Sequence, residues 1–259
     1  MEPSNSALLK LAPVTTAEVA DRAALHTPRL RAATTRVLRR APEGTIILSA
    51  HPDDAALSLA GTIAAGLLAV PLTIVTVFDR TDFAGPGQRG GLDTVSAIRA
   101  QEDETFCAAA GVHLERLGMN DACVRHPNLA IAALFERPML EPAITAELLE
   151  HLNELADRFP NAQLLAPAGV GGHMDHTLLA EAARASRWRR PMFYADQPYA
   201  LRLGIAPIDP VLTIRHAPCA LQAKLTAAAA YSSQPAATDL VRLLYRAAPG
   251  TPIEWVTPT

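Results

Sequence analysis

Cysteine is scarce in this 259-residue chain, and neither sign of charge is in large excess. The three cysteines, Cys107, Cys123 and Cys219, are far apart, odd in number and outside any Cys-x-x-Cys pair. This argues against a disulfide framework and a thiolate zinc site, so we expect reduced thiols in a cytoplasmic protein. Residues 1–10 lack the basic and apolar regions of a signal peptide, which agrees with that location.

The net charge of −3 leaves no basic excess to neutralise phosphates, which argues against nucleic acid as a partner. Residues 60–78 form the one apolar run long enough to imitate a membrane span. Pro71 divides this run into a part rich in Ala and Leu and a part rich in β-branched residues. A buried helix followed by a buried strand fits that division, so we expect no membrane span.

Short apolar segments alternate with helical ones along most of the chain. Residues 45–50, 55–68 and 72–78 predict a strand, a helix and a strand, and such units build parallel sheets with helices on both faces. Further predicted strands are 112–119, 164–168, 192–195 and 211–215, and further helices are 93–110, 144–159, 176–187, 221–231 and 239–247. Residues 81–91 predict an exposed loop. We expect one Rossmann-like, doubly wound α/β domain over residues 44–259, preceded by a tail and a helix in residues 1–43 that packs on it.

Histidine and aspartate gather where two predicted strands end. Residues 51–54 read His-Pro-Asp-Asp and residues 172–176 read Gly-His-Met-Asp-His. Ligands of open parallel sheets bind at the carboxyl ends of the strands, so both segments reach one edge. A catalytic zinc ion takes imidazole nitrogen and carboxylate oxygen from three side chains and keeps a water. The sequence therefore predicts one zinc ion held by His51, Asp54 and His176, and another divalent ion would also fit.

Three neighbouring residues are left free for catalysis. The carboxylate of Asp53 can take a proton from the water that attacks the substrate. His173 can stabilise an oxyanion or protonate a leaving amine, and Asp175 can orient His173 by accepting its other ring proton. Each segment alone has a plainer explanation, because Asp often caps helices and polar residues are common near helix starts. The two together favour a metal site.

The two segments together resemble the LmbE-like (PIG-L) family of zinc N-deacetylases, which hydrolyse N-acetylglucosamine-type amides in thiol, glycolipid and antibiotic biosynthesis. The resemblance covers about residues 45–234 and includes Arg-Ala-Gln-Glu at 99–102 and an Asp after the Leu-Gly pair at 117–118. Residues 194–199, Lys224 and residues 231–234 also look like motifs of the family. By resemblance, the metal ligands are His51, Asp54 and His176, the general base is Asp53, the oxyanion-stabilising residue is His173, and the substrate contacts are Arg99 and Asp121.

Two positions depart from the family pattern. Many members carry Glu where this chain has Ala55, which affects tuning of the metal rather than binding. Some members carry an aromatic residue at the position of Gly171, whose hydroxyl can assist the oxyanion; here Tyr194 or Tyr199 is a candidate for that donor. The substrate contacts have plainer alternatives, because Arg99 can pair within its helix and Asp121 can belong to a turn.

The sequence thus predicts zinc-dependent hydrolysis of an N-acyl amide, most simply an N-acetyl amide, on a small molecule such as an N-acetylglucosaminyl compound or an intermediate of a specialised pathway. Two alternatives stay open: a metal-dependent amidase for a larger amide or a thiol conjugate, and a non-catalytic Rossmann-like binding protein. A dinucleotide dehydrogenase is disfavoured, because the first strand leads into His-Pro-Asp-Asp rather than a Gly-x-Gly-x-x-Gly turn.

Overall fold

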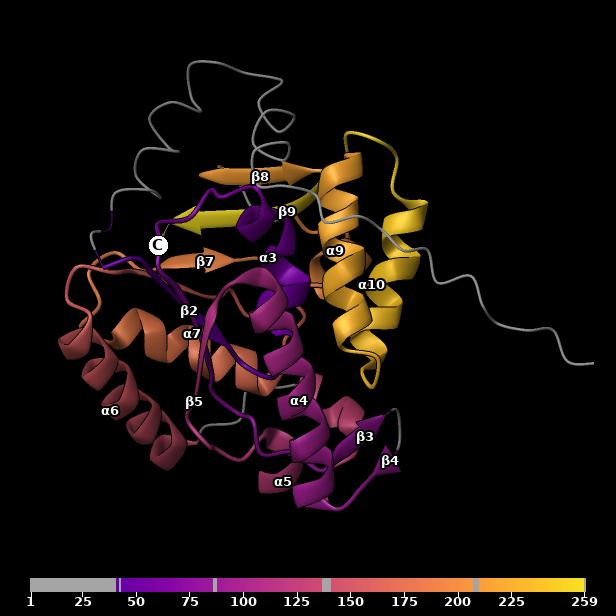
Figure 1. The fold of residues 1–259 in the computed structure, drawn as a ribbon. Helices are drawn as coiled ribbons and strands as arrows, with labels where there is room; N and C mark the ends of the chain where they lie inside the picture. Colours follow the sequence, from indigo (N-terminus) through magenta and orange to yellow (C-terminus); the bar gives the residue numbers. More distant parts are fainter. Residues whose placement is uncertain (1–40, 42, 86–87, 137–140, 207–209, 259) are drawn as a thin grey trace, which may run out of the picture.

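The computed structural model describes residues 41, 43–85, 88–136, 141–206 and 210–258. Within these residues lies a seven-stranded sheet of order β5-β2-β1-β6-β7-β9-β8 (Figure 1). Its strands are β1 (Thr45–Ser49), β2 (Leu72–Thr76), β5 (His113–Arg116), β6 (Gln163–Pro167), β7 (Met192–Tyr194), β8 (Leu212–Arg215) and β9 (Pro252–Pro258). The first five in spatial order are parallel, and β9 runs antiparallel to β7 and β8. The expected α/β fold with a mostly parallel sheet is confirmed.

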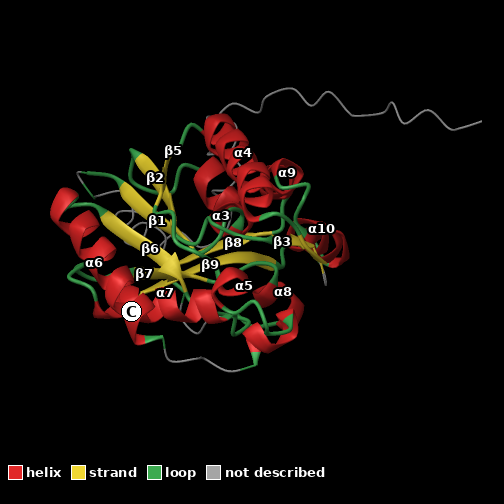
Figure 2. Cartoon of the chain, turned by 90° about the horizontal axis from the view of Figure 1, so that it is seen from below, coloured by secondary structure: helices red, strands yellow, loops and turns green. Residues whose placement is uncertain are grey.

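Helices cover both faces of this sheet (Figure 2). One face carries α3 (Asp54–Ala64), α4 (Leu92–Ala110), α9 (Pro218–Ala230) and α10 (Pro235–Arg246). The other face carries α6 (Pro142–Arg158) and α7 (Met174–Ala185). Short elements complete the loops: α5 (Ala122–Arg125), the 3-10 helix η1 (Ile131–Phe135) and α8 (Tyr199–Leu203).

Strand β1 shows why its sequence is an unbroken apolar run. Ile46 and Leu48 belong to the core cluster beneath α6 and α7, whereas Ile47 belongs to the cluster beneath α3 and α9. Successive side chains of a strand point to opposite faces, so a strand between two helix layers must be apolar at every position. All five residues of β1 are buried, and the strand holds the chain rigidly up to the segment that follows it.

Two parts of the fold differ from the sequence-based expectation. Strand β9 was not predicted, although it lies inside the sheet between β7 and β8. Residues 81–91, predicted as a loop, contain a small antiparallel hairpin of β3 (Phe83–Gly85) and β4 (Gln88–Arg89). Helix α7 begins at Met174 rather than at His176, so that His173 precedes its first turn.

Helix α3 is anchored at its middle by a fully buried ion pair. Lys224 of α9 and Glu254 of β9 lie 2.7 Å apart with no exposed side-chain surface. Lys224 donates to the carbonyl of Leu57, and Glu254 accepts from the backbone N–H groups of Gly61 and Thr62, both at 2.8 Å. The carbonyl of Leu57 and the N–H of Gly61, partners in a regular α-helix, thus both bind this ion pair. It joins two distant elements to the helix that begins at Asp54.

Among the described residues, no helix is long and apolar enough to cross a membrane. The division 60–78 into helix, turn and strand is confirmed, because α3 ends at Ala64 and β2 begins at Leu72. Residues 1–40 and 42, which contain nearly all of the expected N-terminal tail and helix, lie outside the described residues. The sheet itself takes strands from Thr45 through to Pro258.

Candidate active site

The two polar segments meet at the carboxyl edge of the sheet. β1 and β6 are adjacent parallel strands, and residues 51–54 follow the first while residues 172–176 follow the second. The imidazole rings of His51 and His176, distant in sequence, have centroids 5.2 Å apart. The predicted convergence of these segments is therefore what the fold produces.

One carboxylate oxygen of Asp54 lies near a ring nitrogen of both His51 and His176. Oδ2 of Asp54 lies 3.2 Å from Nδ1 of His51 and 3.2 Å from Nε2 of His176. With zinc–ligand bonds of about 2.0–2.2 Å, neighbouring ligand atoms of a tetrahedral ion lie about 3.3 Å apart. The three side chains, each at most 9% exposed as residues, thus have the chemistry and the spacing to hold one divalent ion.

His173 completes a second possible donor set. The rings of His51, His173 and His176 offer nitrogen atoms that all lie within 4.8 Å of one another. Nδ1 of His173 accepts a hydrogen bond from the backbone N–H of Asp175 at 3.2 Å, which leaves Nε2 as its free atom. Burial and the neighbouring charge of His51 lower the pKa of His173 to about 3, so this ring is neutral at physiological pH.

The carboxylate of Asp175 does not orient His173, and this part of the sequence-based prediction is wrong. Oδ2 of Asp175 lies 2.9 Å from Nε2 of His51, and Oδ1 accepts from Arg125 at 2.6 Å. The reason is geometric, because residues two positions apart at a helix start do not face each other. Asp175 instead fixes the ring of His51, whose Nδ1 then points at Asp54.

His176 has a matching carboxylate partner that the sequence reasoning did not single out. Nδ1 of His176 lies 2.7 Å from Oδ1 of Asp196, and Oδ2 of Asp196 accepts from the backbone N–H of Val170 at 2.8 Å. A carboxylate behind a histidine fixes the ring orientation and makes the facing nitrogen a better metal ligand. Asp196 follows β7, so the rule that ligands lie at strand ends could have found it.

Asp53 projects into the cavity instead of capping its helix. It occupies the N-cap position of α3 but makes no side-chain capping hydrogen bond, and its backbone has φ 114°. A non-glycine residue at positive φ is strained, and such strain is concentrated at functional sites. Burial raises the pKa of Asp53 to about 7, against the opposing charge of Arg99. The plainer helix-cap explanation therefore does not hold for this residue.

Arg99 reaches across from α4 to the same loop. Its guanidinium donates to the carbonyl of Pro52 at 2.6 Å and lies 3.3 Å from Oδ1 of Asp53. Arg99 does not pair with Glu102 of its own helix, because the Glu102 carboxylate accepts hydrogen bonds from Ser233 instead. Arg99 lines the cavity, and its Nε is buried without a hydrogen-bond partner among the described residues.

Asp121 belongs to a turn and also lines the cavity. Its side chain accepts from the N–H of Val124 at 2.9 Å and so caps α5, and it also lines the cavity. Only 3% of the residue is exposed, and burial raises its pKa. A buried carboxylate with one backbone partner and one side-chain partner, here Thr81, retains acceptor positions for a ligand hydroxyl.

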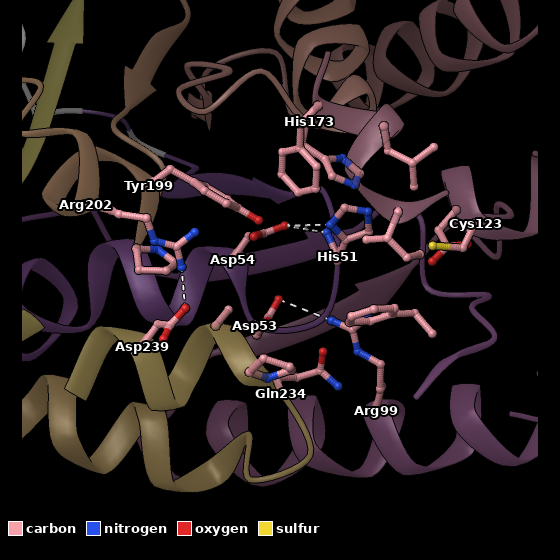
Figure 3. Close-up of a pocket in the computed structure, with 18 residues that line it drawn as sticks. His51, Asp53, Asp54, Arg99, Cys123, His173, Tyr199, Arg202, Gln234 and Asp239 are labelled. Carbon is pink, nitrogen blue, oxygen red and sulfur yellow. Dashed lines mark hydrogen bonds and ion pairs between the residues drawn. The ribbon is translucent and has the colours of Figure 1, made fainter. Parts of the chain in front are cut away.

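Tyr199 fills the space beside Gly171. A Cβ atom added to Gly171 would lie 2.7 Å from Cγ of Tyr199, so the Tyr199 ring occupies the space that a side chain at position 171 would need. Tyr199 lines the cavity, and in Figure 3 its hydroxyl points toward Asp54. The other candidate, Tyr194, donates its hydroxyl to the carbonyl of Leu48 at 2.7 Å inside the core. Of the two, only Tyr199 can offer a donor to the cavity.

These residues surround a cavity of about 260 Å³ (Figure 3). The His–Asp cluster and Asp53 lie at its centre in the figure, with Arg99 on one side and Arg202 on the other. Apolar side chains of the hairpin, α5 and η1 also line it: Phe83, Cys123, Ile131, Leu134 and Phe135. The cavity thus combines a metal-type cluster, free polar groups and apolar walls, as binding sites for small molecules do.

The fold and the cluster define an α/β protein with a ligand site at the carboxyl edge of a parallel sheet. The family model described as GlcNAc-PI de-N-acetylase (PIG-L) matches residues 46–186, and the chain belongs to this family. The resemblance inferred from the motifs is therefore confirmed.

One relative and two solved structures illustrate the likeness. The chain is 34% identical over 165 residues to 2'-N-acetylparomamine deacetylase of Streptomyces fradiae, a match that covers 60% of this chain and 57% of the relative. The zinc-inhibited form of teicoplanin deacetylase has a TM-score of 0.59 at 21% identity, over 83% of this chain and 98% of that one. A 4-carboxy-2-hydroxymuconate hydratase of Pseudomonas putida has a TM-score of 0.54 at 15% identity, over 84% and 96%. These structures share the fold, which evidently supports more than one reaction.

Proposed function

We propose that this protein is a zinc-dependent deacetylase that hydrolyses the N-acetyl amide of a small molecule, most simply a 2-acetamido sugar. The observation that carries the proposal is that Oδ2 of Asp54 lies 3.2 Å from a ring nitrogen of both His51 and His176, with Asp53 beside this cluster in the cavity. Membership of the PIG-L family and the name of the Streptomyces fradiae relative agree with this activity. A hydratase has a similar fold, so the fold alone is no argument for deacetylase activity.

The metal would be held by Nδ1 of His51, a carboxylate oxygen of Asp54 and Nε2 of His176. A bound zinc ion acts as a Lewis acid toward the amide carbonyl and the attacking water. Asp175 and Asp196 hold the two imidazoles in the required orientation from behind, at 2.9 and 2.7 Å. His173 is left out of the ligand set because Asp54 already lies between the other two histidines.

Asp53 takes the proton of the attacking water and returns it to the departing amine. A carboxylate with a raised pKa accepts a proton readily and can release it again in the next step. His173 donates the N–H at Nε2 to the oxyanion, because its Nδ1 already accepts the N–H of Asp175. A neutral His173 that donates its ring N–H to the oxyanion has no further proton to give, so the proton for the amine comes from Asp53. Tyr199 can supply a second hydrogen bond to the oxyanion.

Arg99 and Asp121 would bind hydroxyl groups of the sugar. Nε of Arg99 has no partner within the described part of the chain, and the carboxylate of Asp121 retains acceptor capacity. Both residues line the cavity and are at most 4% exposed, so their hydrogen bonds to a ligand would form away from bulk water.

Release of the free amine from a panel of N-acetyl sugars, larger amides and thiol conjugates tests the proposal with the zinc-loaded protein. Asp53→Asn should retain the metal, measured by elemental analysis, and should lose about 10²–10⁴-fold in kcat, the usual contribution of a general base. Asp157→Asn is the matched control, because that carboxylate is 66% exposed and pairs with Arg187 on the surface. Near-normal turnover of Asp53→Asn would remove Asp53 from its role, and no amide hydrolysis by the wild type would contradict the activity itself.

A further inference from the structure

Part of the cavity wall lies beyond the residues that match the family model. The model ends at residue 186, whereas α8 and α10 contribute Tyr199, Arg202, Gln234 and Asp239 to the lining. Figure 3 shows Arg202 and Asp239 on the side of the cavity opposite to Arg99 and Cys123. We call these four residues the rim. The wall that carries the metal-type cluster and the rim thus come from different parts of the chain.

Two residues of the rim, Arg202 and Asp239, mark the open end of the cavity. The side chains of Arg202 and Asp239 are 48% and 38% exposed, while that of Asp54 deeper in the cavity is 8% exposed. A substrate whose amide reaches the cluster and whose remainder continues toward solvent therefore passes the rim. The charged groups of Arg202 and Asp239 therefore lie beside the path of the part of the substrate that extends beyond the amide.

Arg202 and Asp239 form an ion pair that is available to a ligand. Exposed ion pairs contribute little to stability, so either partner can exchange its hydrogen bonds for those of a substrate at small cost. Asp239 also lies 3.6 Å from Arg242, and the guanidinium of Arg202 lies 5.8 Å from the centre of the Tyr199 ring. Together the rim offers a carboxylate, a guanidinium, an amide and an aromatic face, which suit the hydroxyl groups, amino groups and C–H face of a ring.

The rim is fixed to the helix that carries Arg99. Glu102 of α4 accepts from the N–H and the hydroxyl of Ser233 at 2.8 and 2.7 Å, and Gln234 is the next residue. Tyr231, at the start of the same turn, donates to Asp103 of α4 at 2.7 Å. A wall held by buried carboxylates at two points is preorganised, and preorganised walls are the ones that discriminate between ligands.

We infer that the rim is an outer subsite for a second polar ring attached to the N-acetylated unit, and that Arg202 and Asp239 determine specificity for it. The inference rests on the proposed deacetylase function and extends it, because it makes the preferred substrate a molecule of at least two units. Asp239 accepts hydrogen bonds from hydroxyl or ammonium groups of the second ring. Arg202 donates to its hydroxyl oxygens.

The test compares a one-unit with a two-unit probe. The one-unit probe is methyl N-acetylglucosaminide, and the two-unit probe is N-acetylglucosamine joined in α or β linkage to a glucosamine that carries a free amine. We expect the zinc-loaded protein to prefer a two-unit probe in kcat/KM. Asp239→Asn should lower the ratio of two-unit to one-unit kcat/KM about tenfold, the loss expected for one charge-assisted hydrogen bond. Arg202→Gln should lower the same ratio.

Arg242→Gln is the matched control, since Arg242 lies on α10 beside Asp239 but outside the cavity lining, and it should leave the ratio unchanged. Calorimetric binding of the two-unit probe to Asp53→Asn, with and without Asp239→Asn, decides the same question without turnover. Equal affinity in both variants, or an unchanged ratio, would overturn the outer subsite. Binding weakened by Asp239→Asn in a protein whose wild type hydrolyses neither probe would support the subsite and contradict the proposed function instead.

Discussion

At the scale of single residues, measuring the bound metal distinguishes the role proposed for Asp54, a metal ligand, from the role proposed for His173, a hydrogen-bond donor to the oxyanion. If the ligands are His51, Asp54 and His176, Asp54→Ala should lose the metal, and His173→Ala should keep it while turnover falls about 10²–10³-fold through the lost oxyanion donor. Elemental analysis of both purified variants, beside kcat, measures this directly. The opposite pattern, with metal lost from His173→Ala and kept in Asp54→Ala, would assign the three-histidine set as the ligands.

The sequence predicted the site residues that lie together in the two short motifs of His and Asp, and it missed a site residue that lies outside them. His51, Asp53 and Asp54 follow one strand together, and the structure brings them to His176 as expected. Asp196 was given no role, although it lies in the motif at residues 194–199, because it is a single carboxylate on a third loop and no histidine stands beside it in the sequence. The partner of Asp175 was mistaken because sequence proximity to His173 was taken for spatial proximity.

At the scale of elements, helix α3 depends on the ion pair that holds its middle. Glu254→Gln leaves the ammonium of Lys224 buried without its countercharge, which should destabilise the fold by about 3–5 kcal/mol in urea denaturation. The double variant Lys224→Met with Glu254→Gln removes both charges and keeps an acceptor for the N–H of Gly61. It should recover most of that loss.

The control for this prediction is another Glu→Gln change in an ion pair. Glu115 pairs with Arg158 at 2.9 Å, but the two side chains are 33% and 54% exposed. Glu115→Gln should therefore cost less than about 1 kcal/mol. If Glu254→Gln were equally mild, the buried pair would not be what anchors α3.

The elements predicted best were those with a strong local pattern. The helix over residues 93–110 was expected to stop at Gly111, and α4 ends there with that glycine at φ 65°. The helix after β1 was predicted to run to residue 68, but it ends at Ala64, and Gly66 adopts φ 59°. Strand β9 escaped prediction because prolines stand near both ends, a glutamate lies within it, and its partners come from distant segments.

At the scale of the whole molecule, metal binding and stability should be linked through protons. Burial lowers the pKa of His51, but hydrogen bonds to Asp175 and Asp54 outweigh it and raise the pKa to about 9 in the metal-free protein. The pKa of His176 is also raised, chiefly by Asp54 and Asp196 against the effect of burial. A metal ion must displace these protons, so its affinity falls as the pH falls below about 9.

The thermal midpoint of unfolding should therefore rise on addition of zinc, and it should rise more at pH 8 than at pH 6. Each displaced proton changes the dissociation constant about tenfold per pH unit, or about 1.4 kcal/mol. Differential scanning calorimetry with and without a chelator measures both effects. Equal gains at the two pH values would show that no proton leaves the ligands, and His51→Ala, which lacks a ligand, should show little gain at either.

The backbone at residue 53 restricts what natural selection can place there, independently of chemistry. Positive φ is tolerated by glycine and, among other residues, best by Asn and Asp. Of these three, only Asp can accept a proton from water. A family member that has lost hydrolysis but kept its fold would therefore be expected to carry Asn or Gly at this position, and reading that one residue would distinguish it from its active relatives.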